Sequence, residues 1–377
     1  MKVHQLKRKA SRRLESAHLP TLGIQSYGED NLYPQTLRNI ISASPIGAEC
    51  VDRYAEFIEG NGFADLDFAE MVVNRYGDTA DALHADVCRD LAMFGGFALH
   101  IAYNIFGKIA GVTHIPFESV RLTEANERGE VAQCAVHPDW SGNSTRGGKK
   151  IQVNKENTKY LPMFDARPAV VLREIEAAGG LRQYGGQVFY YSNRGRRNYP
   201  ISKADRVVTE MSTDEGLSNV RFRNARNNFL PSALVIVRNG ASQMDDNGTE
   251  FTQQISALQG DENTGKMLVV GVDSQEEEPI VKPLSSQNYD KEFQVTDATT
   301  CERIYAAFGQ DVWNAIRIGK VGFGGSLVKD AFDYYNTLVE RDRRVVERAF
   351  ASIFSHWWAE GERDYSVTPI LYKTWNI

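Results

Sequence analysis

The chain has 377 residues, of which 42% are hydrophobic and 24% charged, and its net charge is −6. This composition is typical of a globular protein with a sizeable core, and it excludes wholesale disorder, a collagen-like repeat and a coiled-coil rod. The longest aliphatic runs, at 233–237 and 267–272, are far shorter than the roughly 20 residues that cross a bilayer. We therefore expect no membrane span and no membrane partner.

The first residues of the chain are strongly basic. Residues 1–13 contain six Lys or Arg, and no apolar stretch follows them, so the pattern is not that of a secretory signal. We expect residues 1–32 to form a flexible basic arm, which either contacts a nucleic acid or a partner or is simply solvated. Folded structure is expected to begin near Tyr33 and Pro34.

The cysteines and histidines do not indicate a metal site. Cys50, Cys88, Cys134 and Cys301 are far apart, without a CxxC pair, so we expect buried, reduced thiols. The seven histidines form no HExxH or His-x-His pattern. We predict neither a metal nor a cofactor.

The next part of the chain predicts helices followed by a sheet. Apolar residues recur at helical spacing over 45–58 and over 79–94, with Asp78 as the cap of the second helix and Gly95 at its end. Four strands, at 97–103, 108–115, 119–122 and 130–137, are expected to form an antiparallel meander. Further strands are predicted at 160–164 and 187–191.

A second group of elements follows residue 200. A helix is predicted at 202–212, interrupted near Gly216 and continued over 217–227. The continuation carries Arg221, Arg223 and Arg226, which either face a neighbouring subunit or a partner protein or form an ordinary solvated helix face. A compact strand-helix-strand module is expected at 232–238, 249–258 and 266–271.

Two long helices are predicted toward the end of the chain, at 289–308 and 327–358. Between them lies a loop with four glycines in nine residues, a composition that favours movement. Its candidate functional residues are Arg317, Lys320, Val321, Gly322, Phe323, Gly324 and Gly325.

We find no convincing catalytic motif. Residues Gly260 to Lys266 match the GxxxxGK half of a phosphate-binding loop, but Met267 follows where Ser or Thr is needed to bind magnesium. The motif also comes after a helix and before a strand, the reverse of the required order. The segment 322–325 resembles the start of a dinucleotide fingerprint, but Leu327 stands in the place of its third glycine. No nucleophile elbow is present, and we predict no catalytic residue.

The order of the segments resembles that of the portal proteins of tailed bacteriophages, in particular the HK97-like family. GGFALHI at 95–101, followed by GKIAGVTHIPFESVR at 107–121, is similar to the wing of these proteins. The stretch from YP at 199–200 to NNFLPS at 227–232 is similar to the stem helix and its entry into the clip. DKEF at 290–293 and ERIYAAFG at 302–309 resemble the returning helix. Gln310 and Asp311 stand where the family has a proline pair.

This resemblance implies an α+β portal-type subunit that assembles into a ring. The implied division is a basic arm at 1–32, a wing at 33–200, a stem helix region at 201–228, a strand-helix-strand clip at 229–285, a second stem helix returning to the wing at 286–316, a tunnel loop at 317–326, and a long helix with a final wing strand at 327–377.

The resemblance also implies a function. A ring, usually of twelve copies, would conduct double-stranded DNA at one capsid vertex of the virion, with assembly in the host cytoplasm. The implied partners are the terminase large subunit, the major capsid protein and a head-completion adaptor. The tunnel loop would contact DNA. Two alternatives remain open, a nucleotide-dependent enzyme that processes nucleic acids and a phage head-assembly protein without a channel.

Overall fold

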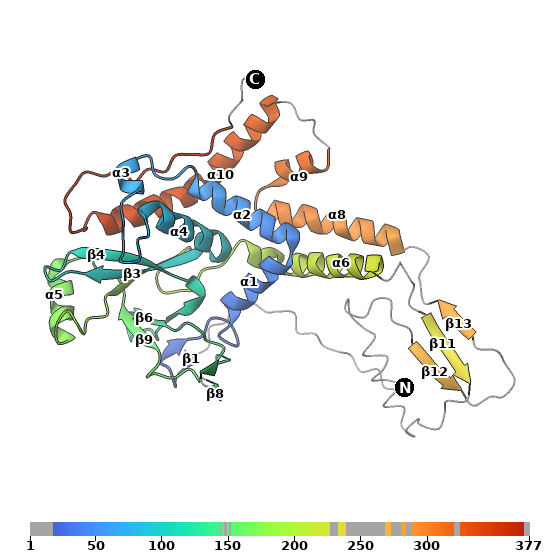
Figure 1. The fold of residues 1–377 in the computed structure, drawn as a ribbon, viewed down its shortest axis with the longest axis horizontal. Coiled ribbons are helices and arrows are strands. Elements are labelled where there is room, and N and C mark those ends of the chain that lie inside the picture. The colour runs from blue at the N-terminus through green and yellow to red at the C-terminus, as the bar shows by residue number, and fades with distance from the viewer. Residues whose placement is uncertain are drawn as a thin grey trace.

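The computed structural model of the chain describes residues 18–372, with gaps at 144, 147–148, 151, 227–232, 239–267, 273–279, 284–288 and 320–324. Within these residues the chain forms a mixed body of helices and small sheets, from which two helices extend toward a separate sheet (Figure 1). The predicted α+β class is confirmed. No helix in the described ranges is long and apolar enough to cross a membrane.

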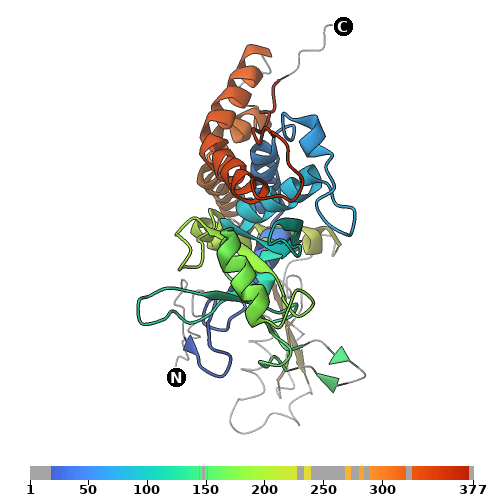
Figure 2. The same cartoon turned by 90° about the vertical axis from the view of Figure 1, so that its left-hand side faces the viewer.

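Helices form one side of the body. Figure 2 looks from the end that carries α5 and shows α10 on one side of the molecule and the strands β1 and β8 on the other. The helices are α1 (Tyr33–Ala43), α2 (Pro45–Glu59), α3 (Leu66–Ala69), α4 (Ala80–Phe94), α5 (Pro168–Ala177), α6 (Val208–Arg226), α8 (Tyr289–Ala307), α9 (Asp311–Arg317) and α10 (Gly325–Phe354).

The strands of the body form two antiparallel three-stranded sheets and two short hairpins. One sheet has the order β10-β3-β4 and the other has the order β5-β6-β9. The strands are β1 (His18–Leu19), β2 (Ile24–Gln25), β3 (Gly96–Tyr103), β4 (Ile109–Ile115), β5 (Val120–Leu122), β6 (Gln133–Val136), β7 (Thr145–Arg146), β8 (Lys149–Lys150), β9 (Lys159–Pro162) and β10 (Gln187–Ser192).

The predicted four-stranded meander is wrong, because β4 and β5 belong to different sheets. Pro116 follows β4, and a 3₁₀ turn at Phe117–Ser119 redirects the chain before β5 begins. Proline has no backbone N–H to donate to a ladder. The later strands β9 and β10 then complete the two sheets through pairings that are distant in sequence.

Residues 18–32 belong to the body, although the sequence predicted a flexible arm as far as residue 32. Ile24 is fully buried, and the ring of Tyr27 stacks on that of Tyr199 with centroids 4.0 Å apart. The buried guanidinium of Arg121 donates hydrogen bonds to the side-chain and backbone oxygens of Asn31, at 2.7 and 2.6 Å. The flexible arm is therefore wrong for these residues, while residues 1–17 lie outside the described part of the chain.

The ends of the predicted helices needed small corrections. Thr79 caps α4 by accepting a hydrogen bond from the N–H of Ala82, so Asp78 is not the cap. Helix α6 continues through Gly216 without the predicted interruption, and Glu210 and Arg221, on either side of that glycine, form ion pairs with α8. Helix α10 ends at Phe354, where the sequence predicted an end near residue 358.

The core lies where α2, α4 and α10 meet the β10-β3-β4 sheet. Helix α10 presents the face that its apolar spacing predicted, and the four cysteines are buried without disulfides, as expected. The face of α10 consists of residues that are at most 1% exposed: Tyr335, Val339, Val346, Phe350 and Ile353.

The segment after α10 closes the body by pairing with the loop after α2. The N–H of Thr368 donates to the carbonyl of Gly62 at 2.9 Å, and the N–H of Asn61 donates to the carbonyl of Thr368 at 2.7 Å. The predicted final strand is reduced to an isolated bridge between Phe63 and Val367. A third backbone hydrogen bond, from the N–H of Ala64 to the carbonyl of Ser366 at 2.8 Å, joins the same two segments.

The separate sheet comes from the part of the chain predicted as a strand-helix-strand module. Strand β11 (Ala233–Arg238) pairs in parallel with β12 (Leu268–Val272), as a crossover connection requires. A third strand, β13 (Ile280–Pro283), pairs antiparallel with β11 and was not predicted. The expected helix at 249–258 and the segment 260–266 lie outside the described residues.

Helix α4 carries a buried histidine in an aromatic environment. The ring of His84 lies 4.6 Å from that of Phe63 and 5.8 Å from that of Phe350, centroid to centroid. Neither ring nitrogen has a hydrogen-bond partner among the described residues. Burial, together with the charge of Arg343, lowers the pKa of His84 from 6.5 to about 4.

The free energy of unfolding should therefore fall as the pH decreases from about 6.5 to about 4. In this range the unfolded chain binds a proton at His84 that the folded chain does not accept. The depressed pKa corresponds to about 3 kcal/mol once the pH is below both values. Urea unfolding at neutral and acidic pH should show a weaker acid dependence in His84→Leu than in the unsubstituted protein.

A second histidine, His114, serves as a control because its effect on stability should depend on pH in the opposite direction. The Nε2 atom of His114 lies 2.7 Å from Asp90 Oδ2. Burial alone would lower the pKa of His114. The hydrogen bond and the charge of Asp90 outweigh the effect of burial, so the pKa of His114 is raised. Its stabilisation is present below pH 6.5 and is lost as the pH rises through the raised pKa. His114→Gln should therefore lose more stability at acidic pH. Equal pH dependence in His84→Leu and the unsubstituted protein would contradict the role given to His84.

Candidate functional site

Helices α6 and α8 form an antiparallel pair that extends away from the body (Figure 1). Next to the body their side chains are covered, and Met211 and Ile304 are fully buried. Farther out, Phe222 is 63% and Val295 is 66% exposed. The pair begins as part of the core and ends as an uncovered surface with apolar side chains.

Asp214 attaches α6 to the beginning of α2. Its carboxylate is 3% exposed and accepts hydrogen bonds from the hydroxyl of Ser44 at 2.7 Å and the N–H of Ile46 at 3.2 Å. Ser44 is the N-cap of α2 and also accepts a hydrogen bond from the N–H of Gly47. A negative charge is favourable there because the first N–H groups of a helix lack partners within the helix. A buried carboxylate therefore holds α6 where it leaves the body.

Two ion pairs connect α6 with α8. Arg221 Nη2 lies 2.6 Å from Asp297 Oδ2, and Arg303 Nη1 lies 3.2 Å from Glu210 Oε1. The side chain of Arg221 remains 53% exposed, so its contact with a neighbouring subunit or partner stays a prediction. The side chains of Arg223 and Arg226, on the last turns of α6, lie outside what the structure describes.

The predicted tunnel loop connects α9 with α10. Arg317 is the last residue of α9, a helix that the sequence did not predict, and Gly325 is the first residue of α10. The role of the loop in contacting DNA stays a prediction. The other predicted loop residues lie outside the described part of the chain: Lys320, Val321, Gly322, Phe323 and Gly324.

Gln310 determines how the chain passes from α8 to α9 and so to the loop. Its side chain is fully buried, and Nε2 donates hydrogen bonds to the carbonyl of Cys50 at 2.8 Å and the hydroxyl of Tyr335 at 2.7 Å. The Tyr335 hydroxyl in turn donates to the carbonyl of Phe308 at 3.3 Å. One amide thus joins α2, the end of α8 and α10. In the sequence, Gln310 stands out only because it occupies a position where the portal family has a proline.

Gly309 makes this turn possible. Its φ is +68°, and a Cβ at this position would stand 2.5 Å from Cδ1 of Leu338. A residue with a side chain would therefore be strained and would collide with α10. Arg53 contacts the other end of the Gln310 side chain, because its Nη1 donates to Gln310 Oε1 at 3.3 Å. The Cζ atom of Arg53 lies over the ring of Trp313, 5.2 Å from the ring centroid.

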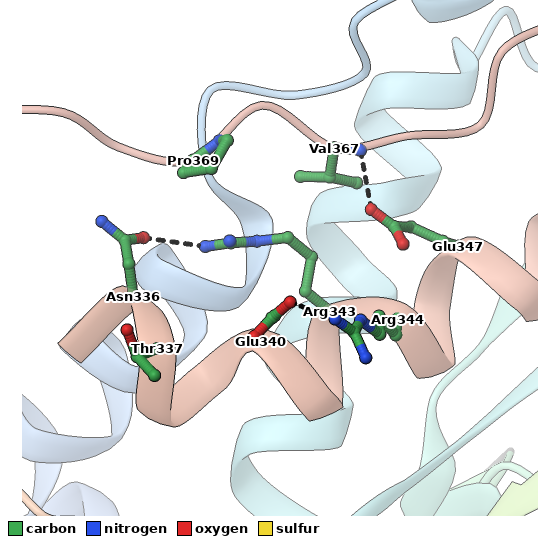
Figure 3. Close-up of a pocket in the computed structure, with 8 residues that line it drawn as sticks. All are labelled: Asn336, Thr337, Glu340, Arg343, Arg344, Glu347, Val367 and Pro369. Carbon is green, nitrogen blue, oxygen red and sulfur yellow. Dashed lines mark hydrogen bonds and ion pairs between the residues drawn. The ribbon is translucent and has the colours of Figure 1, made fainter. Parts of the chain in front are cut away.

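A shallow pocket of about 400 Å³ lies between α10 and the segment that follows it (Figure 3). Arg343 crosses it and donates to the carbonyl of Phe57 at 2.5 Å and to Asn336 Oδ1 at 3.0 Å. Glu347 accepts a hydrogen bond from the N–H of Val367 at 2.9 Å. Glu347 and Asn336, whose Nδ2 donates to the carbonyl of Ile370 at 2.7 Å, fasten the closing segment to α10, while Arg343 joins α10 to the end of α2. No group of three potential metal ligands is found within the described ranges.

Comparison with known proteins gives structural matches only. No protein-family model and no curated protein sequence matches the chain. Its structure is similar to a chain in the neck of a native gene transfer agent (GTA) particle computed with C12 symmetry. The two chains are 15% identical, the match covers 86% of this chain and 81% of the GTA chain, and the TM-score is 0.47. It is also similar to an HK97-family phage portal protein from Corynebacterium diphtheriae, with 12% identity, 76% and 84% covered, and a TM-score of 0.33. The family that the sequence resembles is thus represented among these structures.

Replacing Gln310 with alanine should destabilise the body. Gln310→Ala removes the donor to Cys50 and Tyr335 and leaves a polar cavity, which should lower the free energy of unfolding by about 2–4 kcal/mol. Urea unfolding measures this change. The matched control is Gln183→Ala, at an exposed position, where a change within about 0.5 kcal/mol is expected. If both variants unfold at the same urea concentration, the junction at Gln310 does not hold the three helices.

Proposed function

We propose that this chain is a portal-type subunit, copies of which form a ring that conducts double-stranded DNA at one vertex of a phage capsid. The observation that carries the proposal is the α6–α8 pair, which leaves the body with Phe222 and Val295 exposed at 63% and 66%. A projecting helix pair cannot cover such side chains by itself, and apolar surface is more stable when removed from water. Neighbouring copies side by side in a ring would cover them.

The proposed role is structural. Glu347, which lines the pocket beside α10, accepts a hydrogen bond from the closing segment, and Arg343 donates to the end of α2, which supports a mechanical function for that region. The alternative of a nucleotide-dependent enzyme depends on the segment 260–266. A head-assembly protein without a channel is the remaining alternative, and the size and shape of the assembly distinguish it from a portal.

The negative charge of the chain fits a channel through which DNA slides. Each copy carries a net charge of −6, and a ring multiplies this charge around its axis. Like charges repel at short range, while salt screens the repulsion beyond about 8–10 Å. An acidic channel wall would therefore keep DNA from adhering, and the loop at 317–326, with Lys320 and Phe323, would make the closest contacts.

In this proposal the ring has several successive partners. A twelve-copy ring would receive DNA from the motor that contains the terminase large subunit, sit among copies of the major capsid protein, and later bind a head-completion adaptor. Assembly would take place in the host cytoplasm, and the finished ring would remain in the virion.

Particle size tests the proposal directly. Twelve copies of 42.3 kDa give a particle of roughly half a megadalton, which native mass spectrometry measures and negative-stain microscopy shows as a ring with a central hole. A monomer or dimer that hydrolyses ATP would contradict the proposal and favour the enzyme. A large assembly without a hole would favour the head-assembly alternative.

The exposed side chains of the helix pair should be needed for assembly. Phe222→Glu combined with Val295→Glu places charges on the surface that neighbouring copies would cover, so the variant should remain monomeric while its circular dichroism and urea unfolding stay unchanged. The control is Ile105→Glu, which replaces another apolar side chain, 69% exposed in the turn between β3 and β4. It should still form rings. Rings of normal size from the double variant would show that these side chains lie outside the contact.

The loop is expected to act on DNA and not on assembly. Removing residues 319–325 should leave the ring intact but reduce the amount of DNA retained in particles built with the shortened chain. Mass spectrometry reports the ring, and the DNA content of purified particles reports retention. If the shortened chain fails to form rings, the loop has a structural role and this part of the proposal is wrong.

A further inference from the structure

One part of the body is basic although the chain as a whole is acidic. Residues 120–200 contain 13 Lys or Arg and 8 Asp or Glu, while the whole chain contains 43 and 49. Most of the positive side chains in this part are exposed. A charge separation of this kind marks a surface that attracts an anionic partner.

Three of these residues lie on the loop between β10 and the next helix. Arg194, Arg196 and Arg197 stand within residues 192–198, where the N–H of Gly195 donates to the carbonyl of Ser192 at 2.9 Å. The N–H of Asn198 donates to the carbonyl of Gly195 at 3.1 Å, and the hydroxyl of Tyr190 donates to the carbonyl of Asn198 at 3.2 Å. The backbone is therefore held by these hydrogen bonds, while the side chains of Arg194 and Arg197 are exposed.

A second turn brings another arginine to the same place. Asn126 organises residues 126–130, because its side-chain oxygen accepts hydrogen bonds from the N–H groups of Arg128 and Glu130 at 3.0 and 2.9 Å. The Arg197 guanidinium lies beside this turn, with Nη1 3.6 Å from the point where a Cβ on Gly129 would stand. Arg197 therefore lies beside the turn that carries Arg128, and Arg194 precedes Arg197 by three residues in the same loop; we call Arg128, Arg194 and Arg197 the arginine surface.

No residue of the arginine surface forms an ion pair with another described residue. Arg196 is engaged, since its Nη2 donates to the carbonyl of Phe164 at 2.9 Å. Arg128, Arg194 and Arg197 are exposed and take part in none of the ion pairs that the described residues form. The turn at 126–130 also carries two exposed acidic residues, Glu127 and Glu130, and the carboxylate of Glu130 accepts a hydrogen bond from Asn126 Nδ2 at 3.3 Å.

We propose that the arginine surface, Arg128, Arg194 and Arg197, binds the phosphate backbone of double-stranded DNA without regard to base sequence. Guanidinium groups match phosphate oxygens in pairs, and rigid turns reduce the entropic cost of binding. A protein partner would require an apolar anchor, but none of the large exposed hydrophobic side chains of the described chain falls within 123–131 or 192–200. The proposal adds to the portal function a DNA contact outside the channel loop.

The salt dependence of DNA binding tests this proposal. The full-length chain is titrated against a labelled duplex of about 30 base pairs, in two unrelated sequences, between about 50 and 200 mM salt. The variant combines Arg128→Ala, Arg194→Ala and Arg197→Ala. The slope of log K against log salt should become shallower by about 0.9 for each phosphate that the variant no longer neutralises. The control combines Arg75→Ala, Arg206→Ala and Arg348→Ala, which removes the same charge from other positions and should keep the original slope.

The outcomes separate this proposal from the portal function. An unchanged slope in the triple variant, or an equal change in the control, would overturn the arginine surface. Tighter binding of an acidic peptide such as poly-glutamate than of the duplex would also overturn it, in favour of a protein partner. Ring formation is measured on the same samples. If the protein stays monomeric while the slope changes as predicted, the arginine surface stands and the portal proposal fails.

Discussion

The hydrogen bonds of Gln310 are the interaction on which the arrangement of the C-terminal helices depends. One buried amide connects α2, through Cys50, with α10, through Tyr335, at the point where the chain leaves α8. A polar group at this place is favourable only when all its partners are present, because a buried amide without hydrogen bonds costs several kcal/mol. The path of α9, and with it both ends of the glycine-rich loop, follows from this junction.

Elsewhere the body relies on single buried charges that are satisfied by neutral groups. Asp214 accepts hydrogen bonds at the N-terminus of α2, and Arg121 donates to backbone and amide oxygens with no carboxylate among its hydrogen-bond partners in the described structure. Burial lowers the pKa of Arg121 to about 10, which leaves it charged at neutral pH. If such a buried charged side chain moved, it would lose hydrogen bonds that no other group could replace, because its partners surround a single position. Both residues therefore act as fixed points, one for α6 and one for residues 18–32.

The helices α2, α4, α6, α8 and α10 were predictable from sequence, whereas α1, α3, α5 and α9, and the contacts between helices, were not. The apolar spacing of α2, α4 and α10 depends on neighbours three and four residues away, so it is visible in the sequence. Strand pairing depends on partners far along the chain, which is why Pro116 ended a sheet where a meander was expected. In the candidate site, the helical segment carrying Arg221 was found, but its pairing with Asp297 was not. No local pattern distinguishes a buried Gln310 or Arg121 from exposed ones, because their burial results from tertiary packing.

The closing segment after α10 has a consequence for how the protein is made. Asn61 donates a hydrogen bond to the carbonyl of Pro369, a contact that spans 308 residues. Such a contact forms only after the ribosome has released nearly all of the intervening chain, and contacts of this range slow folding. The loop after α2 therefore remains open throughout translation. Incomplete chains therefore lack a finished body until synthesis has passed the closing segment.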